Sequence, residues 1–521
     1  MKRRVGIYGW GIIAPQSKDV AAFEKHLEST DSWLTPHKGF AQSNFLVGEP
    51  DFTFSDYKPW IDERFPPSRF SQLTEKMDMP TLFAIGAFIQ SLGQNPGIEQ
   101  ELQKLGTRAH VYVGTGLGAF GTFEKVSLDL HRAERNWNRF WSAPSRNEAF
   151  AAYLAGDRSE PGIPPDPATA GVDEVDDAED RWWRFWAERS SALAKFLSEL
   201  REIESLTVQG EVESGKIGLI KEKQRRVNRL VAAWGCPTMP WRSVSANLLW
   251  NIHNTPAAQI SMLGRITGFT FAPVAACSTF GVTLKLAMDA IERGEAKAVV
   301  IGATDPPPLN LTVGAFANAR VAAADGSVSK PMTGLRGTHV GGGSAIWIVG
   351  DREHFDALGF RPLGMEPIGV GVSSDADHII TPSKEGPKTA ILQALANAGV
   401  EPAEVVSWDL HATATPGDYL EVENMRSILH EHVLVTARKG TFGHGMSAGG
   451  GFELTAQYLG YQRGLIFPTP LAETELNPQI ARVHERFAFT EGCPAPDGIA
   501  GKLSMGVGGI NACVISRPLP R

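Results

Sequence analysis

Residues 273–305 constrain the fold most strongly, because they combine a helical pattern with a buried strand. The stretch begins with a short apolar run that ends at Cys277, and the apolar residues after it recur at helical spacing. Gly294 ends this helix, and residues 298–302 form an apolar run typical of a fully buried strand in a parallel sheet. The pattern therefore predicts an α/β fold in which Cys277 lies where a strand gives way to a helix.

The predicted position of Cys277 favours a reactive thiol. A helix N-terminus carries a partial positive charge and unpaired N–H groups, which stabilise a thiolate and lower the thiol pKa. Ser278 and Thr279 are both candidates for the residue that caps the helix. A lone cysteine is more often a small buried core residue, so the choice between the two roles depends on the rest of the chain.

The composition limits the class of protein. The chain has 521 residues, of which 42% are hydrophobic, which is enough for more than one core or for one large double domain. A net charge of −8 gives no indication of a nucleic-acid-binding surface. The four cysteines are too few and too scattered for a disulfide framework or a zinc site. The longest apolar runs fall short of the ~18 residues of a membrane span, so we expect a cytoplasmic protein.

Predicted strands and helices alternate along most of the chain. Strands are expected at 5–13, 109–114, 298–302, 345–349, 405–410, 433–436 and 500–516, the last with a turn. Helices are expected at 19–28, 81–92, 387–398, 417–429 and 448–459. This alternation in both halves predicts an α/β architecture with parallel sheets that is compatible with a duplication.

Residues 124–241 differ in character from the rest of the chain. They hold an acidic, proline-rich interval at 157–180, which is typical of a loop, and a helical pattern at 181–203. They also hold seven of the thirteen tryptophans: Trp137, Trp141, Trp182, Trp183, Trp186, Trp234 and Trp241. We interpret the segment as a helical cap packed on the main body, and the alternative is a surface for a partner or a substrate tunnel.

Two histidines also lie at predicted strand ends. His411 follows a strand in LHATATPGD, and His444 lies between a strand and a helix in KGTFGHGMSAGG. Loops at strand ends, flanked by small residues, are where α/β proteins present catalytic groups. Together with Cys277 these histidines indicate a catalytic centre.

These motifs resemble those of the β-ketoacyl synthases, the condensing enzymes of the thiolase superfamily, and especially their decarboxylating Cys-His-His branch. AACSTFG is similar to the nucleophile segment of that family, and HATATPGD is similar to its HGTGTxxGD. KGTFGHGMSAGGGFE matches KSxxGHxxxAAGxxE without gaps, which places Lys439, His444 and Glu453 on the family's functional lysine, second histidine and helix glutamate. The resemblance runs from VGIYGWGIIAP to SMGVGGINA and leaves out the tryptophan-rich segment.

The resemblance implies the thiolase fold, with duplicated αβαβα layers and a large helical insertion in the first half. The implied parts are an N-terminal thiolase-like half (1–123 and 242–360), the insertion (124–241) and a C-terminal thiolase-like half (361–521). The resemblance also implies a homodimer, with a heterodimer as the alternative, and acyl carrier protein as the partner. Neither a nucleic acid nor a membrane span is expected.

The activity implied by the resemblance is that of a β-ketoacyl synthase. It would couple a cysteine-bound acyl group to malonyl-acyl carrier protein with loss of carbon dioxide, in fatty acid, polyketide or polyene biosynthesis. No metal or organic cofactor is expected, because the substrates are carried on the phosphopantetheine of the carrier protein.

The resemblance also implies a role for each site residue. The Cys277 thiolate would attack the acyl thioester, and the backbone N–H groups of Cys277 and Val507 would form the oxyanion hole. His411 and His444 would stabilise the enolate. The supporting residues would be Lys439, which sets the electrostatics of the histidines, Glu453, which bridges the loops, and Thr413 and Thr415, which hydrogen-bond the pantetheine arm.

Several positions depart from the family pattern. Met505 and Val507 stand where family phenylalanines gate the acyl pocket, so Met505 is a candidate substrate-binding residue. The family's PFDxxRDGFVxGEG corresponds to residues 331–343, which lack its Asp and Glu, so we expect a structural charge network to be rebuilt. Ile380 takes a place where a hydroxyl residue often touches pantetheine.

Two other classes are alternatives. A non-catalytic partner subunit of the chain-length-factor type would form a heterodimer with an active synthase, but the chain retains Cys277, His411 and His444. A degradative thiolase would need a second catalytic cysteine in a CxG turn, and Cys513 lacks that glycine pattern. A chain-initiating synthase would carry Asn in place of His444.

Overall fold

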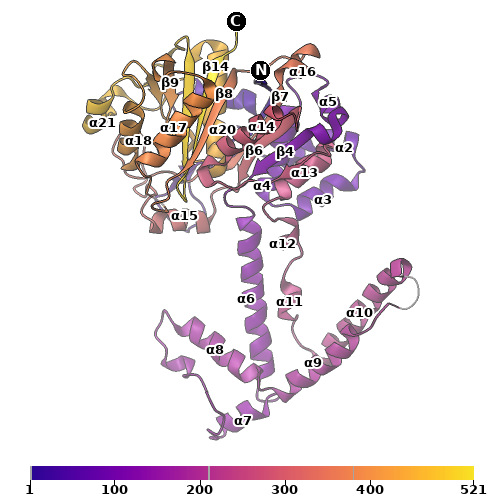
Figure 1. Ribbon diagram of the computed structural model, residues 1–521. Coiled ribbons are helices and arrows are strands. Elements are labelled where there is room, and N and C mark those ends of the chain that lie inside the picture. Colours follow the sequence, from indigo (N-terminus) through magenta and orange to yellow (C-terminus); the bar gives the residue numbers. More distant parts are fainter. Residues whose placement is uncertain (1–2, 209–211, 380, 521) are drawn as a thin grey trace. The chain divides into compact units, whose positions relative to one another are not determined.

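The computed structural model describes residues 3–208, 212–379 and 381–520, so Ile380 lies outside the described residues. The chain divides into two compact units (Figure 1). The first comprises Met1–Gly121 and Leu249–Arg521, and the second comprises Thr122–Leu248. Residues 124–241, predicted as an insertion, fall within the second unit. The boundaries of the two thiolase-like halves stay predictions.

Among the described residues, the first unit contains two five-stranded sheets (Figure 1). The first sheet has the order β1-β7-β6-β4-β5, with β1 (Val5–Ile13), β4 (Ala109–Gly114), β5 (Thr270–Phe271), β6 (Ala298–Asp305) and β7 (Gly343–Asp351). The second has the order β10-β9-β13-β14-β8, with β8 (Met365–Ser374), β9 (Val405–Asp409), β10 (Leu434–Thr436), β13 (Ile499–Gly506) and β14 (Ile510–Pro518).

The sheets are mixed, so the prediction of parallel sheets is wrong for some strands. β7 runs antiparallel to β1 and β6, and β14 runs antiparallel to β13 and β8. Because both faces of each sheet are covered, a buried apolar run looks the same whichever way its strand runs. A tight turn at residues 507–509 joins β13 to β14, and such a short connection requires an antiparallel pair.

Helices form three layers around the two sheets. Between the sheets lie α14 (Thr279–Glu292), which contacts β4, β6 and β8, and α20 (Met446–Arg463), which contacts β6, β7 and β8. On the first sheet pack α4 (Met79–Ser91) and α13 (Thr255–Gly264). On the second sheet packs α17 (Glu385–Ala398), with α18 (Gly417–Arg426) against it. The implied αβαβα layering is confirmed.

The other elements of the first unit are short. Its strands are β2 (Thr35–Pro36), β3 (Leu46–Val47), β11 (Leu465–Ile466) and β12 (Cys493–Pro494). Its α-helices are α1 (Val20–Leu27), α2 (Lys58–Arg64), α3 (Ser68–Lys76), α5 (Ile98–Leu105), α15 (Asn310–Asn318), α16 (Arg352–Ala357), α19 (Lys439–Phe442) and α21 (Pro478–Val483). Its 3-10 helices are η1 (Phe54–Tyr57), η2 (Gly106–Arg108), η4 (Ala276–Ser278), η5 (Pro402–Glu404) and η6 (Glu473–Glu475).

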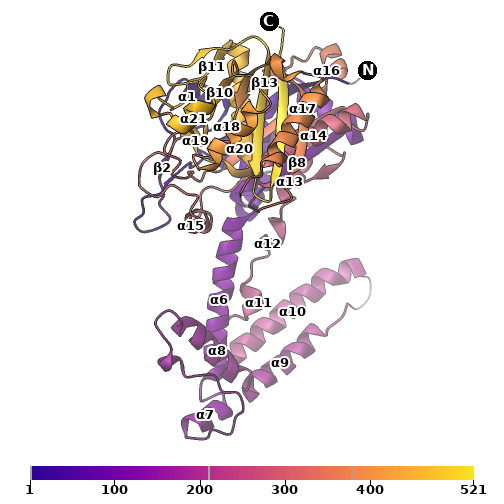
Figure 2. The same ribbon diagram turned by 60° about the vertical axis from the view of Figure 1, so that its left-hand side comes forward.

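The elements of the second unit that the structure describes are helical. They are α6 (Phe120–Ser142), which begins at the boundary, α7 (Glu148–Leu154), η3 (Pro167–Thr169), α8 (Val175–Ala187), α9 (Ser191–Glu204), α10 (Val212–Trp234), α11 (Pro240–Ser243) and α12 (Asn247–Trp250), which ends just beyond it. Helices α9 and α10 lie side by side (Figure 2). Across residues 3–208, 212–379 and 381–520, no helix has the length and apolar character needed to cross a membrane.

The helix predicted at 181–203 is wrong in its bounds, because it consists of two helices. Ser190 separates α8 from α9, and its hydroxyl accepts the N–H of Leu193 at 3.2 Å and so caps α9. Helix α8 also begins at Val175, so the end of the predicted loop at 157–180 is helical.

Apart from Trp241, the tryptophans of the second unit pack in cores of that unit itself. Trp137 and Trp141 pack with Phe196 and neighbours from α9 and α10. Trp182 and Trp186 pack with Phe150 in a second cluster. These rings are buried against one another, so their number is explained without packing on the main body or on a partner protein.

Replacing Trp141 by alanine is expected to lower the free energy of unfolding of the second unit by about 3–5 kcal/mol. Its ring is fully buried and contacts the rings of Trp137, Phe140 and Trp234. The matched control is Trp241→Ala, because that ring is 53% exposed. Chemical denaturation followed by circular dichroism measures both variants, and equal losses would show that the buried rings do not form the core.

Candidate active site

Cys277 lies in η4, directly before α14, and η4 packs against α20 and β13. The preceding residue, Ala276, has a φ of 46°. Residues other than glycine rarely adopt this left-handed conformation, and such strain is concentrated at active sites. The Cys277 side chain is buried, with 8% of its surface exposed. Cys277 thus lies directly before a helix, at the junction with a strand-like segment that the sequence predicted.

The hydroxyls of Ser278 and Thr279 do not cap α14 as predicted. The single proton of the Ser278 hydroxyl is shared between the carbonyl oxygens of Ser504 (3.0 Å) and Ile510 (2.7 Å). The Thr279 hydroxyl accepts the N–H of Ala275 at 3.0 Å. Ser278 already has helical backbone angles, which a capping residue lacks. Its hydroxyl instead attaches η4 to the β13–β14 hairpin.

The Cys277 thiol is less acidic than predicted. Burial raises the pKa of Cys277 to about 11, while Lys439 and the N–H groups of Val507 and of Cys277 itself act in the opposite direction. The expectation of a lowered thiol pKa is wrong because desolvation of the thiolate outweighs the favourable backbone N–H groups. At neutral pH the side chain is a thiol, which must lose its proton as it reacts.

This pKa predicts how the alkylation of Cys277 depends on pH. Because only the thiolate reacts, the rate should rise about tenfold per pH unit between about pH 7 and about pH 10 without levelling off. In Lys439→Met the whole profile should move to higher pH, since Lys439 lowers the pKa of Cys277. Mass spectrometry of the Cys277 peptide after timed exposure to iodoacetamide measures the rate, and a plateau near neutral pH would contradict the high pKa.

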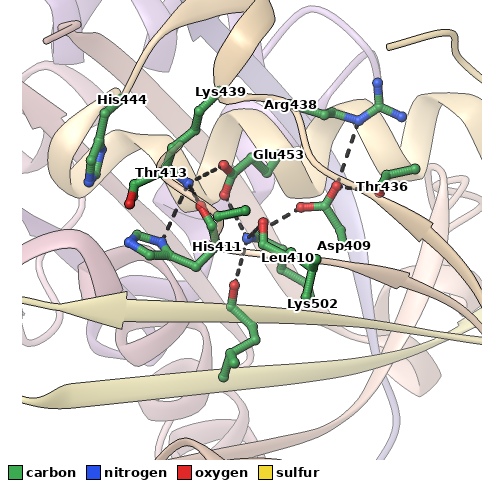
Figure 3. Close-up of polar contacts among 12 residues, drawn as sticks. Asp409, Leu410, His411, Thr413, Thr436, Arg438, Lys439, His444, Glu453 and Lys502 are labelled. Carbon is green, nitrogen blue, oxygen red and sulfur yellow. Dashed lines mark hydrogen bonds and ion pairs between the residues drawn. The ribbon is translucent and has the colours of Figure 1, made fainter. Parts of the chain in front are cut away.

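His411 and His444 lie together, and α20, which follows His444, packs against the segment that holds Cys277. His411 follows β9 and His444 lies between α19 and α20, so segments far apart in sequence meet here (Figure 3). The centroids of the two rings are 5.3 Å apart, and the rings meet edge to face at 80°. Both side chains are buried.

The hydrogen bonds at Nδ1 determine the tautomer of each histidine. The N–H of Met446 donates to His444 Nδ1 at 3.1 Å, and Lys439 Nζ is 3.4 Å from His411 Nδ1. Because Nδ1 accepts in each ring, the proton of the neutral imidazole is on Nε2. Burial, with Lys439 as the next cause, holds the pKa of each histidine well below its usual value. Both rings are therefore neutral and can each donate one hydrogen bond from Nε2.

The backbone of the His411 loop is held by two acidic residues of α18. The carboxylate of Glu421 accepts the N–H groups of His411 (2.6 Å) and Ala412 (2.7 Å). The carboxylate of Asp418 accepts the N–H of Thr413 at 2.8 Å. These roles were not predicted from the sequence, although the acidic spacing at the N-terminus of a helix after HATATPG was a visible signal.

Lys439 and Glu453 form a buried ion pair near the histidines (Figure 3). Lys439 Nζ contacts Glu453 Oε1 and also donates to the carbonyl oxygen of His411. The pair continues into a charge cluster that sequence analysis missed, with Asp409, Arg438 and Lys502. The sequence holds one sign of this cluster: Lys502 is the single charged residue of the apolar strand IAGKLSMG.

The remaining predicted residues border the same site. Val507 lies in the β13–β14 turn, and its N–H and that of Cys277 both lower the pKa of the Cys277 thiol. Met505 is 9% exposed on β13. The hydroxyls of Thr413 and Thr415 are 2.9 Å apart and share one hydrogen bond.

The expected rebuilding of charge at residues 331–343 takes a different form. Arg336 there pairs with Asp325 at the surface, whereas the buried charges lie on β9, β13 and α20. In the part of the chain that the structure describes, no three His, Cys, Asp or Glu side chains are arranged to hold a metal ion. The expectation that the reaction needs no cofactor stays a prediction.

Two family models match the first unit and the end of the second. "Beta-ketoacyl synthase, N-terminal domain" matches residues 237–354, and "Beta-ketoacyl synthase, C-terminal domain" matches residues 366–472. Nodulation protein E of Rhizobium meliloti is 29% identical over 238 residues, which are 43% of this chain and 59% of that protein. A 3-oxoacyl-[acyl-carrier-protein] synthase 2 of Rhizobium meliloti (strain 1021) is 29% identical over 282 residues, 51% of this chain and 64% of that protein. The chain thus spans about three fifths of the length of these relatives.

Solved structures share the fold. "The ishigamide ketosynthase/chain length factor" has a TM-score of 0.68 at 19% identity and covers 100% of both chains. A β-ketoacyl synthase from Burkholderia phymatum STM815 has a TM-score of 0.67 at 17% identity and covers 99% of this chain and 100% of that one. These likenesses show the thiolase fold, and over residues 237–354 and 366–472 the chain is similar to the two domains of the β-ketoacyl synthases.

Proposed function

We propose that this chain is an active, decarboxylating β-ketoacyl synthase of fatty acid or polyketide biosynthesis. The observation that carries the proposal is the pair of buried, neutral histidines that each keep an Nε2–H free to donate, where α20 packs against the segment that holds Cys277. Two such donors can stabilise the single oxygen anion of an enolate, which is the charge that forms when a malonyl thioester loses carbon dioxide.

The first half-reaction is acyl transfer to Cys277. Its sulfur attacks the carbonyl carbon of an acyl thioester, the carbon–sulfur bond to the carrier breaks, and the thiol proton passes to the departing carrier thiolate. The N–H groups of Cys277 and Val507, which already act on the sulfur, stabilise the oxyanion of the tetrahedral intermediate. Splitting the coupling in this way replaces one difficult step by two easier ones.

The second half-reaction forms the carbon–carbon bond. The malonyl thioester loses carbon dioxide, and its electron pair forms an enolate whose oxygen accepts hydrogen bonds from His411 and His444. The enolate carbon attacks the acyl carbon on Cys277, and the thiolate leaves and regains a proton. The product is a 3-oxoacyl thioester lengthened by two carbons. Burial, with Lys439 held by Glu453 as the next cause, lowers the pKa of both histidines and so keeps them neutral and able to donate.

An acyl carrier protein is the proposed partner, with Thr413 and Thr415 as contacts for its pantetheine arm and Met505 as a wall of the acyl pocket. A structural neighbour at 16% identity is described as a "type II PKS acyl-carrier protein in complex with its ketosynthase". We propose a homodimer as the assembly, with a heterodimer as the alternative.

A chain-length-factor-type partner subunit is the second candidate. Two structural neighbours are described as ketosynthases together with a chain length factor, one of them from Xenorhabdus doucetiae. The pair of neutral histidines favours an active subunit, because a non-catalytic partner has no need of two buried Nε2–H donors on rings 5.3 Å apart.

The experiment that separates the two functions uses the purified chain alone. Acyl-carrier thioesters and malonyl-carrier protein are added, and mass spectrometry follows the carrier-bound product. An active synthase yields the 3-oxoacyl product without another subunit. A partner subunit yields none until a separate synthase is supplied.

A further inference from the structure

A second lysine, Lys502, lies beside the Lys439–Glu453 pair and has no part in the steps above (Figure 3). It is on β13, and its side chain is 1% exposed. A lysine is almost never fully buried unless its charge is paired, so its contacts indicate what it does.

Two hydrogen bonds and an ion pair hold the ammonium group of Lys502. It donates to the carbonyl oxygens of Leu410 (3.1 Å) and Leu503 (2.6 Å), and it is 2.6 Å from Glu453 Oε2. Leu410 immediately precedes His411. The other oxygen of Glu453 faces Lys439, which binds the carbonyl oxygen of His411 itself. The two lysines thus hold two successive peptide carbonyls of the histidine loop and share one carboxylate between them.

Asp409 is the counter-charge on the other side of Lys502. The two residues are register partners in the parallel pair of β9 and β13, and Lys502 Nζ is 3.3 Å from Asp409 Oδ1. The second oxygen of Asp409 accepts the Thr436 hydroxyl at 2.6 Å and lies 3.7 Å from Arg438 Nε. Arg438 is also buried, but its contacts are with Asp409 and the carbonyl oxygen of Phe467 rather than with the histidine loop.

We propose that Lys502 is a positioning residue for His411. Lys502 holds the peptide that precedes His411 and the second oxygen of Glu453, and this keeps the His411 ring in the place that decarboxylation requires. This inference rests on the proposed function. Lys502 does not touch the reacting atoms. It acts through the position of the His411 ring and through the positive charge that it places beside the histidines.

The charged groups that face His411 come from four other elements. They are Glu421 of α18, Lys439 of α19 and His444 after it, Glu453 of α20, and Lys502 of β13. After burial, the causes that lower the pKa of His411 are Lys439, then His444, then Lys502. Loss of the Lys502 charge should therefore raise the pKa of His411, so that protonation removes activity at a higher pH than in the wild type.

The test uses Lys502→Met, which keeps the length of the side chain and removes its charge. Acylation of Cys277 should stay within about twofold of the wild type. Decarboxylation of malonyl-carrier protein should fall about tenfold to a hundredfold, the cost of a small misplacement at a reacting centre. The acidic limb of its pH profile should move to higher pH, and an NMR titration of the His411 ring should show the same shift.

Two further variants make the result specific. Arg438→Met removes a buried cation from the same cluster and should leave the acidic limb and the His411 titration in place. The double variant Lys502→Met/Asp409→Asn also removes the charge that opposes Lys502, so it can fold even if the unpaired Asp409 destabilises the single variant. It should show the same shift of the acidic limb and of the His411 titration. The inference would be overturned if neither the acidic limb of the pH profile nor the His411 titration shifted in the two Lys502 variants. Equal losses of acylation and decarboxylation would also overturn it. A wild-type chain that does not decarboxylate malonyl-carrier protein would instead contradict the proposed function.

Discussion

His444→Ala is expected to decarboxylate malonyl-carrier protein about a hundredfold to a thousandfold more slowly than the wild type, the loss typical of one oxyanion donor. His444 keeps its Nε2–H free because the N–H of Met446 occupies Nδ1. Without it the enolate oxygen retains only the donor from His411. Acyl transfer to Cys277 should change much less, since that step uses backbone N–H groups. Release of carbon dioxide and acylated-protein mass measure the two half-reactions separately.

The matched control for this prediction is His484→Ala. His484 is another buried histidine of the first unit, and its Nε2 is 3.2 Å from the carbonyl oxygen of Arg486. Its removal should lower stability and leave the decarboxylation rate per folded molecule unchanged. If both variants lost the two half-reactions in parallel, His444 would be a structural residue rather than a donor to the enolate.

Cys277→Ala is expected to abolish both acylation and condensation, because it removes the sulfur that is proposed to attack the acyl carbonyl. The variant should still fold, since alanine leaves the Ser278 hydroxyl bonded to Ser504 and Ile510. It should also still decarboxylate malonyl-carrier protein, because His411 and His444 remain. The histidine and cysteine variants thus have opposite effects on the two half-reactions.

Cys513→Ala is the control for the nucleophile. Cys513 is fully buried on β14, and burial also raises the pKa of its thiol. The variant should acylate at the wild-type rate after correction for any loss of folded protein. Acyl mass on Cys277→Ala would show that the nucleophile lies elsewhere.

The positions of the site residues could be predicted because local signals place them. Cys277 and His411 lie where an apolar strand-like run meets small residues, and helix and strand periodicity reads directly from the sequence. For His444 the predicted strand end is wrong, because the short helix α19 lies between β10 and this residue. The direction of β7 and β14 could not be predicted, because an apolar run buried on both faces has the same pattern in either direction.

The electrostatics of the site depend on contacts between distant segments. Lys502 meets Leu410 and Glu453 only after three separate segments have packed together, so spacing along the chain carries no trace of these pairs. The same holds for the pKa of Cys277, since the helix N-terminus is visible in the sequence but the burial that outweighs it is not. In the second unit, the pattern of tryptophans predicted burial but not that the rings would bury one another.

The most direct test of the central claim follows the mass of the Cys277 peptide through one turnover. The purified chain is incubated with an acyl-carrier thioester, digested and analysed, and a second sample receives malonyl-carrier protein before digestion. The account predicts an acyl group on Cys277 in the first sample and its disappearance in the second, together with a 3-oxoacyl product two carbons longer. An unmodified Cys277 peptide, or an acyl group that stays on Cys277 while carbon dioxide is released, would contradict the account.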